Sequence, residues 1–160
     1  MRTVAAETTI RRMERLFGLP AHPLIVHFPV VAIPALAIAA LIWVVKPWSK
    51  NASLGLAAFG IVTTVSTILA ASSGEALADL LSSGESIDRH RELGNTLRLI
   101  VVVQTVGLLG MVGVGVREAS EKNTVGLILR AVTAVLSILS VIWVIRVGHE
   151  GASQSWGFLS

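Results

Sequence analysis

The sequence predicts an all-α integral membrane protein: an up-down-up-down four-helix bundle forming one transmembrane domain over residues 1–160, with short amphipathic segments at the face that carries the histidines. Two observations indicate this class. Hydrophobic residues make up 53% of the chain and charged residues 14%, with a mean hydropathy of +0.75, whereas soluble domains carry about 25% charged residues. Four apolar stretches each approach the roughly 20 residues that cross a hydrocarbon core. We therefore expect spans near 24–45, 52–73, 93–116 and 124–147, with both chain ends on one side of the membrane.

Residues 1–20 precede the first span and are predicted to form an interfacial or flexible N-terminal segment. Within them Ile10, Met13 and Phe17 share one helical stripe beside several arginines, a pattern typical of a helix lying in the membrane interface. A frayed basic tail is the alternative. The apolar stretch that follows is longer than the apolar region of a signal peptide, so we interpret it as a retained helix.

The first span begins near two histidines and contains interior prolines. Pro29 and Pro34 each remove a helical hydrogen bond and are expected to bend the axis. His27 lies one turn inside the span, whereas His22 lies just outside it, before Pro23, where helical geometry is disfavoured. The two histidines are about 140° apart around a helix, so they are not expected to chelate one ion from a regular helix.

The other three spans carry polar residues that must be satisfied inside the bilayer. Small and hydroxylated residues in the second span favour close helix packing, and Ser72-Ser73-Gly74 is interpreted as the signal that ends its helix. Gln104, near the middle of the third span, must find a partner on another helix, because an unsatisfied amide in hydrocarbon is costly. Hydroxyls in the fourth span are expected to bond back to their own helix; these are Thr133, Ser137 and Ser140.

The most polar stretch lies between the second and third spans. Ala76, Leu77 and Leu80 make an apolar stripe beside Glu75 and Asp79, which predicts a short amphipathic helix on the membrane surface. For the two carboxylates we adopt the simple interpretation that they solvate this segment.

Two residue types are missing from the chain, and their absence limits its chemistry. Without cysteine there can be no disulfide, iron–sulfur cluster, zinc–thiolate site or covalent haem attachment, so any haem would be b-type. Without tyrosine, the interfacial aromatic role falls to tryptophans such as Trp43 and Trp143. The chain also lacks a glycine-rich phosphate loop and the H-E-x-x-H and G-x-S-x-G motifs, so we do not expect it to be an enzyme on its own.

All four histidines fall at or near the ends of the predicted spans. Because successive spans cross the membrane in opposite directions, these ends lie at one membrane face. They are His22, His27, His90 and His149. Imidazole is the commonest metal ligand and is proton-active near neutral pH, so this clustering predicts a functional site.

Three motifs carry these histidines. The stretch A-H-P-L-I-V-H-F-P-V resembles the signature of the domain-of-unknown-function 2231 family of small bacterial membrane proteins, and R-H-R-E-L-G-N and G-H-E-G resemble its later blocks. The resemblance extends from about Leu19 to about Gly157 and departs at Ala152, where many relatives have a second glycine. It implies four helices with histidine motifs at one end, similar to four-helix cytochrome b membrane proteins, and assigns no function.

The sharpest functional hypothesis is a membrane b-type haem-binding electron-transfer protein or redox-complex subunit. A four-helix bundle can hold haem between facing helices through axial histidines. His27 and His90 are the expected axial ligands, with His149 the substitute for either and His22 a supporting donor. Arginines on the same side suit bidentate pairing with haem propionates; these are Arg91, Arg98 and Arg146.

Two alternatives stay open. Copper or zinc could be held by the imidazoles of His27, His90 and His149 with carboxylates nearby. A subunit that binds nothing could use the same histidines to close helix ends within a larger membrane complex. The expected partners are the lipid bilayer and other membrane redox proteins or subunits, and no nucleic acid.

The placement of Lys and Arg predicts the orientation in the membrane. The histidine side holds eight of these residues and the other side five, but four of the five lie in or beside two short loops, where the positive-inside rule gives them most weight. We therefore expect a multi-pass protein of the bacterial inner membrane with an extracytoplasmic histidine face.

Overall fold

The computed structural model describes residues 15–16, 19–46, 48–80, 85–113 and 124–156. Apart from short connections, the described part is helical except for a two-residue antiparallel ladder between β1 (Arg15–Leu16) and β2 (Leu19–Pro20). A short helix, α2 (Ala21–Ile25), precedes four long ones: α3 (His27–Val45), α4 (Lys50–Leu80), α5 (Glu85–Gly113) and α6 (Thr124–Trp156). The interfacial helix predicted within residues 1–20 lies largely outside the described residues.

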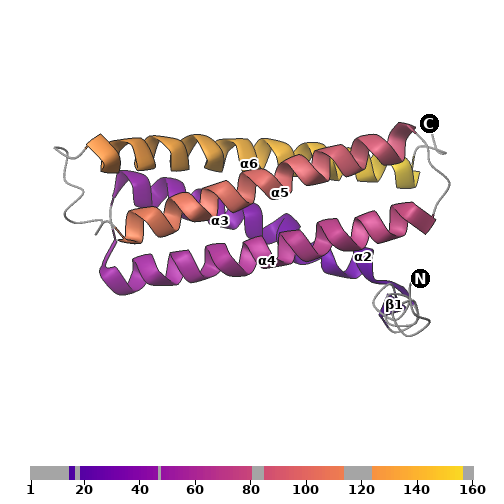
Figure 1. The fold of residues 1–160 in the computed structure, drawn as a ribbon, viewed down its shortest axis with the longest axis horizontal. Coiled ribbons are helices and arrows are strands. Elements are labelled where there is room, and N and C mark those ends of the chain that lie inside the picture. Colours follow the sequence, from indigo (N-terminus) through magenta and orange to yellow (C-terminus); the bar gives the residue numbers. More distant parts are fainter. Residues whose placement is uncertain (1–14, 17–18, 47, 81–84, 114–123, 157–160) are drawn as a thin grey trace, which may run out of the picture.

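The four long helices form an antiparallel bundle (Figure 1). Both α3 and α5 pack against α4 and α6. Each long helix contains a stretch apolar enough to cross a membrane, within His27–Val45, Lys50–Asp79, Ile87–Gly113 and Thr124–Ser153. Large apolar side chains such as Val31 and Leu127 are exposed on the outer surface, where lipid would contact them. The prediction of an all-α membrane bundle is confirmed.

Three of these helices are longer than the predicted spans. α4, α5 and α6 contain 31, 29 and 33 residues, or roughly 45 Å of helix each against a hydrocarbon core of about 30 Å. The extra turns lie at the right-hand end of Figure 1, where α4 ends, α5 begins and α6 ends. We call this the histidine end, because α2, the start of α5 and the end of α6 carry histidines there.

The segment predicted to be a separate amphipathic surface helix is instead the last part of α4, which continues to Leu80. Its residues Ala76 and Leu77 are partly buried. Because these two residues are partly covered by the bundle, this part of the segment continues the helix instead of lying on the membrane.

A break between α2 and α3 follows from a proline. Pro29 has no N–H to pair with the carbonyl of Ile25, and α2 ends at Ile25 while α3 begins at His27. Val26 between them keeps helical angles (φ −66°, ψ −23°), and its N–H donates to the His22 carbonyl at 3.1 Å. This interruption separates a short helix that packs on α4 and carries His22.

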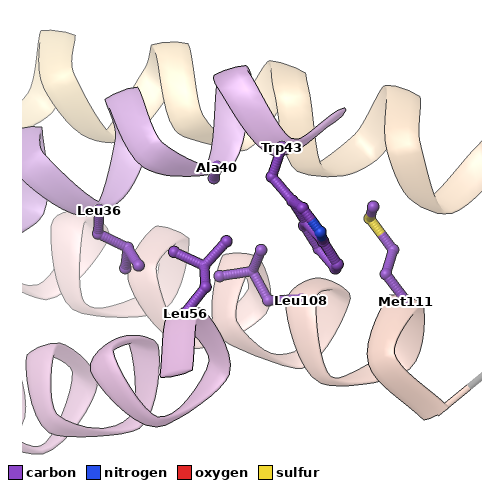
Figure 2. Packing of buried hydrophobic residues seen from close by; sticks show 6 residues of the cluster. All are labelled: Leu36, Ala40, Trp43, Leu56, Leu108 and Met111. Atoms are coloured by element: carbon purple, nitrogen blue, oxygen red, sulfur yellow. The ribbon is translucent and has the colours of Figure 1, made fainter. Parts of the chain in front are cut away.

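The largest apolar cluster lies toward the end opposite the histidines (Figure 2). It contains Leu36, Ala40 and Trp43 of α3, Leu56 of α4, and Leu108 and Met111 of α5. Trp43 is fully buried, and its indole N–H donates to Ser53 Oγ at 3.0 Å. Trp43 therefore faces the inside of the bundle rather than lipid, and the Ser53 hydroxyl satisfies its indole there.

Polar residues in the middle of the bundle find the partners that the sequence requires. Gln104 is fully buried, and its Nε2 donates to Ser137 Oγ of α6 at 3.1 Å. Ser137 and Ser140 donate to carbonyls of their own helix at 2.8 and 2.9 Å. Thr133 departs from the prediction, because its Oγ1 donates to the Met111 sulfur of α5 at 3.5 Å. These bonds join α5 to α6.

Candidate functional site

Two histidines from separate helices meet at the histidine end. The imidazoles of His22 on α2 and His90 on α5 have centroids 6.4 Å apart and planes inclined at 89°. Both residues are half-buried. The structure therefore joins His90 to His22, the residue that the sequence had ranked as supporting.

The His22 ring is held by α4. Its Nδ1 lies 3.0 Å from the Ala70 carbonyl and 3.2 Å from Ser73 Oγ, and the Ser73 hydroxyl itself donates to the Ala70 carbonyl at 2.9 Å. A carbonyl only accepts, so Nδ1 carries the hydrogen and Nε2 of the neutral ring keeps its lone pair. Metal-ligating histidines use this arrangement, with the second ring nitrogen donating to a backbone carbonyl or carboxylate.

Burial favours the neutral form of His22. Loss of solvent lowers the pKa of this imidazole below its ordinary value, the Ala70 hydrogen bond partly opposes the effect, and repulsion from a charged His90 adds to it. A neutral imidazole is the form that ligates a metal.

His90 rests against α6. It lies beside the Val147 carbonyl and the Glu150 carboxylate, and Glu150 pairs with Arg89 Nε at 3.6 Å. The Nδ1 atom of His90 is buried and meets hydrogen-bond geometry with no group in the described part of the chain. Nδ1 of His90 is therefore a ring nitrogen without a strict hydrogen bond in the described residues, although the ring lies beside the Val147 carbonyl.

A glycine lies against each imidazole. A Cβ atom added at Gly74 of α4 would lie 2.9 Å from Cε1 of His22, and one at Gly151 of α6 would lie 3.1 Å from Cε1 of His90. Both positions thus leave room for a ring rather than for a side chain of their own. Gly74 lies inside α4, so its interpretation as the end of the helix is wrong; the bundle packing carries α4 past it.

Ion pairs connect the helices around the histidines. Arg91 pairs with Asp79 at 3.2 Å and Arg98 with Glu75 at 3.8 Å, each joining α5 to α4. The two carboxylates that the sequence assigned to solvation therefore have protein partners. The third expected propionate partner, Arg146, is exposed and places its guanidinium 5.0 Å from the Trp143 ring centroid.

The remaining two histidines are exposed. His27 lies at the first position of α3 and His149 near the end of α6. Among the residues that the structure describes, no three or more His, Asp or Glu side chains come together as a metal-binding group. The set of His27, His90 and His149 predicted for copper or zinc is not gathered in the described residues.

A family described as "predicted membrane protein (DUF2231)" matches residues 18–159. The chain belongs to this family. The family expected from the sequence is thereby confirmed, and a multi-pass membrane location is supported by the family and by the four apolar helices. Neither the curated proteins nor the solved structures that were compared contain a match to the chain.

Each motif of this DUF2231 protein contributes to the histidine pair. The first supplies His22 and the second supplies His90, while the third, G-H-E-G, supplies Glu150 and Gly151 beside His90. Gly74 belongs to none of the three. The sequence offered one signal for it, a glycine within a helix-forming stretch, which points to close packing as well as to a helix end.

Proposed function

We propose that this protein is a b-type haem-binding electron-transfer protein or redox-complex subunit, with His22 and His90 as the axial ligands. The observation that carries the proposal is the meeting of two imidazoles from separate helices at 6.4 Å. Two imidazoles this close together could both hold one metal centre. The donor set of two neutral imidazoles without sulfur suits low-spin haem iron.

The number of ligands favours haem over a bare ion. Zinc in proteins takes three or four protein ligands, whereas haem iron needs only two from the protein because the porphyrin supplies the others. The described residues bring two imidazoles together. When bound, the haem would supply one-electron redox chemistry.

The surrounding residues would orient and stabilise the group. The Ala70 carbonyl holds the Nδ1–H of His22 and so leaves Nε2 with its lone pair, and burial favours the neutral ring. Arg91 and Arg98 lie on the same helix as His90 and would exchange their present carboxylate partners for haem propionates, which guanidinium groups bind in a bidentate manner. His27 and His149 have no part in this arrangement.

An absorption spectrum of the detergent-purified full chain, oxidised and then reduced with dithionite, tests the proposal. We expect a Soret band with sharp α and β bands on reduction, and loss of these bands in His22→Ala and in His90→Ala. The matched controls His27→Ala and His149→Ala change exposed histidines and should keep the spectrum.

Other outcomes assign the protein to the alternatives. A colourless protein with stoichiometric copper or zinc by elemental analysis would indicate a bare metal site. A protein without chromophore or metal would indicate a structural subunit, which its co-purifying membrane partners would then identify. Loss of the spectrum in His27→Ala with retention in His22→Ala would restore the ligand ranking made from the sequence.

A further inference from the structure

The first and third helices of the bundle bury the same positions. Five buried residues of α3 correspond to five buried residues of α5, because each pair differs by the same number of residues along the chain. In chain order, the residues of α3 are Ile33, Leu36, Ala37, Ala40 and Trp43, and those of α5 are Val101, Gln104, Thr105, Leu108 and Met111. The histidines follow the same shift, because His22 precedes Ile33 by as many residues as His90 precedes Val101.

The second and fourth helices correspond in the same way. Four buried residues of α4 match four buried residues of α6, again at one constant difference in residue number. In chain order, those of α4 are Leu56, Gly60, Thr63 and Thr67, and those of α6 are Thr133, Ser137, Ser140 and Val144. Ala70 and Val147 are related by this shift, and so are Gly74 and Gly151.

The packing of the bundle fits two related units. One unit is α2, α3 and α4, and the other is α5 and α6; they meet where α3 packs on α6 and where α4 packs on α5 (Figure 1). Two hairpins that face each other about a two-fold axis along the bundle make these reciprocal contacts. In each unit the histidine precedes the core of the first helix and lies against the second.

We propose that the bundle consists of two copies of one helical hairpin. In this arrangement Gly74 and Gly151 are equivalent positioning residues, and they hold His22 and His90 at equivalent places across the two-fold axis. This inference rests on the proposed function for its biological meaning, since it explains how each unit contributes one ligand. In each unit the imidazole lies beside a backbone carbonyl, that of Ala70 or Val147, four residues before the glycine.

The physical reason is the space above that carbonyl. Residues four apart stack on one face of a helix, so a side chain at the glycine position would cover the carbonyl that the imidazole approaches. The added methyl at Gly74 would sit 2.9 Å from the His22 ring, and that at Gly151 would sit 3.1 Å from the His90 ring. The methyl at Gly74 must displace its imidazole, and the methyl at Gly151 would press on its imidazole, so we expect each to move the ring that it meets.

The two units differ in one neighbour of the histidine. Ser73 and Glu150 occupy corresponding positions, each one residue before the glycine. The hydroxyl of Ser73 lies 3.2 Å from Nδ1 of His22, whereas His90 has the Glu150 carboxylate nearby. The duplicated design therefore places the two imidazoles symmetrically and gives them different electrostatic surroundings.

The test compares Gly74→Ala and Gly151→Ala with Gly148→Ala and Gly94→Ala, where an added Cβ meets nothing within 4 Å. Histidine ring signals of the full chain in detergent, recorded by NMR with isotope-labelled histidine, report ring environment without requiring any cofactor. We expect Gly74→Ala to shift the His22 signals and Gly151→Ala to shift the His90 signals, with both sets unchanged in the two controls. Unchanged ring signals in a folded Gly74→Ala or Gly151→Ala protein would overturn the proposal.

A second measurement covers variants that fold poorly. If the added methyl acts through the imidazole, removing the ring relieves the clash, so the pair Gly74→Ala with His22→Ala should recover the thermal stability that Gly74→Ala alone loses. The pair Gly151→Ala with His90→Ala should behave in the same way. Additive losses in both pairs would contradict the positioning role. Neither measurement uses haem. If the wild-type protein contains no haem, the proposed function is wrong, but these two measurements still decide whether the glycines position the histidines.

Discussion

The His22 imidazole shows how the fold selects one nitrogen of a single residue. Its Nδ1–H is committed to the Ala70 carbonyl at 3.0 Å, which leaves the Nε2 lone pair for a ligand. The same residue in a solvated loop would exchange between tautomers. The chemistry of the site therefore begins with one backbone hydrogen bond between α2 and α4.

The stability of the cofactor-free chain should depend on pH through His22. Its folded pKa is lowered from the ordinary value of 6.5, chiefly by burial. Below that ordinary value the unfolded chain binds a proton that the folded chain resists, so folding stability falls as the pH drops. We expect the thermal unfolding midpoint in detergent to decrease from about pH 7.5 to about pH 5.5. His22→Asn should show a weaker decrease, and an identical pH profile in the variant would exclude His22 as the source.

At the scale of elements, the break between α2 and α3 directs His22 to its partners. The helix is interrupted at Val26, before His27, and α2 packs on α4. The interruption lets the turn that carries His22 settle against α4. Pro29 thus acts at a distance of seven residues from the histidine that it positions.

Pro29→Ala supplies the missing N–H for the Ile25 carbonyl and should straighten the junction. We expect the helical content measured by circular dichroism to stay the same or rise, while the His22 ring signals shift and any bound haem decreases. Pro34→Ala, which changes the proline inside α3, is the matched control and should leave the His22 signals in place. Equal effects of the two substitutions would argue against a specific role of the junction.

At the scale of the whole molecule, charge is distributed unevenly along the bundle. All acidic residues within the described part of the chain lie at the histidine end together with Arg89, Arg91, Arg98 and Arg146, whereas Lys46, Lys50 and Arg130 lie toward the other end. The positive-inside rule counts Lys and Arg and gives acidic residues little weight. The extracytoplasmic position of the histidine end therefore stays a prediction.

The absence of native cysteine allows a clean test of orientation. Asp88→Cys at the histidine end and Lys50→Cys at the other end each introduce one thiol at an exposed position. In intact cells, a membrane-impermeant maleimide should label the first variant and leave the second unlabelled until the cells are permeabilised. The reverse labelling pattern would place the histidine end in the cytoplasm.

Much of the fold followed from properties that a sequence carries locally. Long apolar stretches match the thickness of a bilayer, so the four helices and their antiparallel order were predictable, as was the need of Gln104 for a partner on another helix. The boundaries at the histidine end were not, because α4, α5 and α6 continue past the apolar stretches where they pack on one another. The inward orientation of Trp43 was not predictable for a related reason, since its indole is satisfied by Ser53 on a different helix.

The sequence by itself determined that this is a four-helix membrane protein with four histidines at one end, because hydropathy and chain direction alone set those features. Only the tertiary structure decided that His22 pairs with His90 while His27 and His149 stay exposed. Which imidazoles meet depends on the rotation of each helix about its axis, on the Pro29 junction, and on the space left by Gly74 and Gly151. Those are properties of contacts between helices, and no single stretch of the chain contains them.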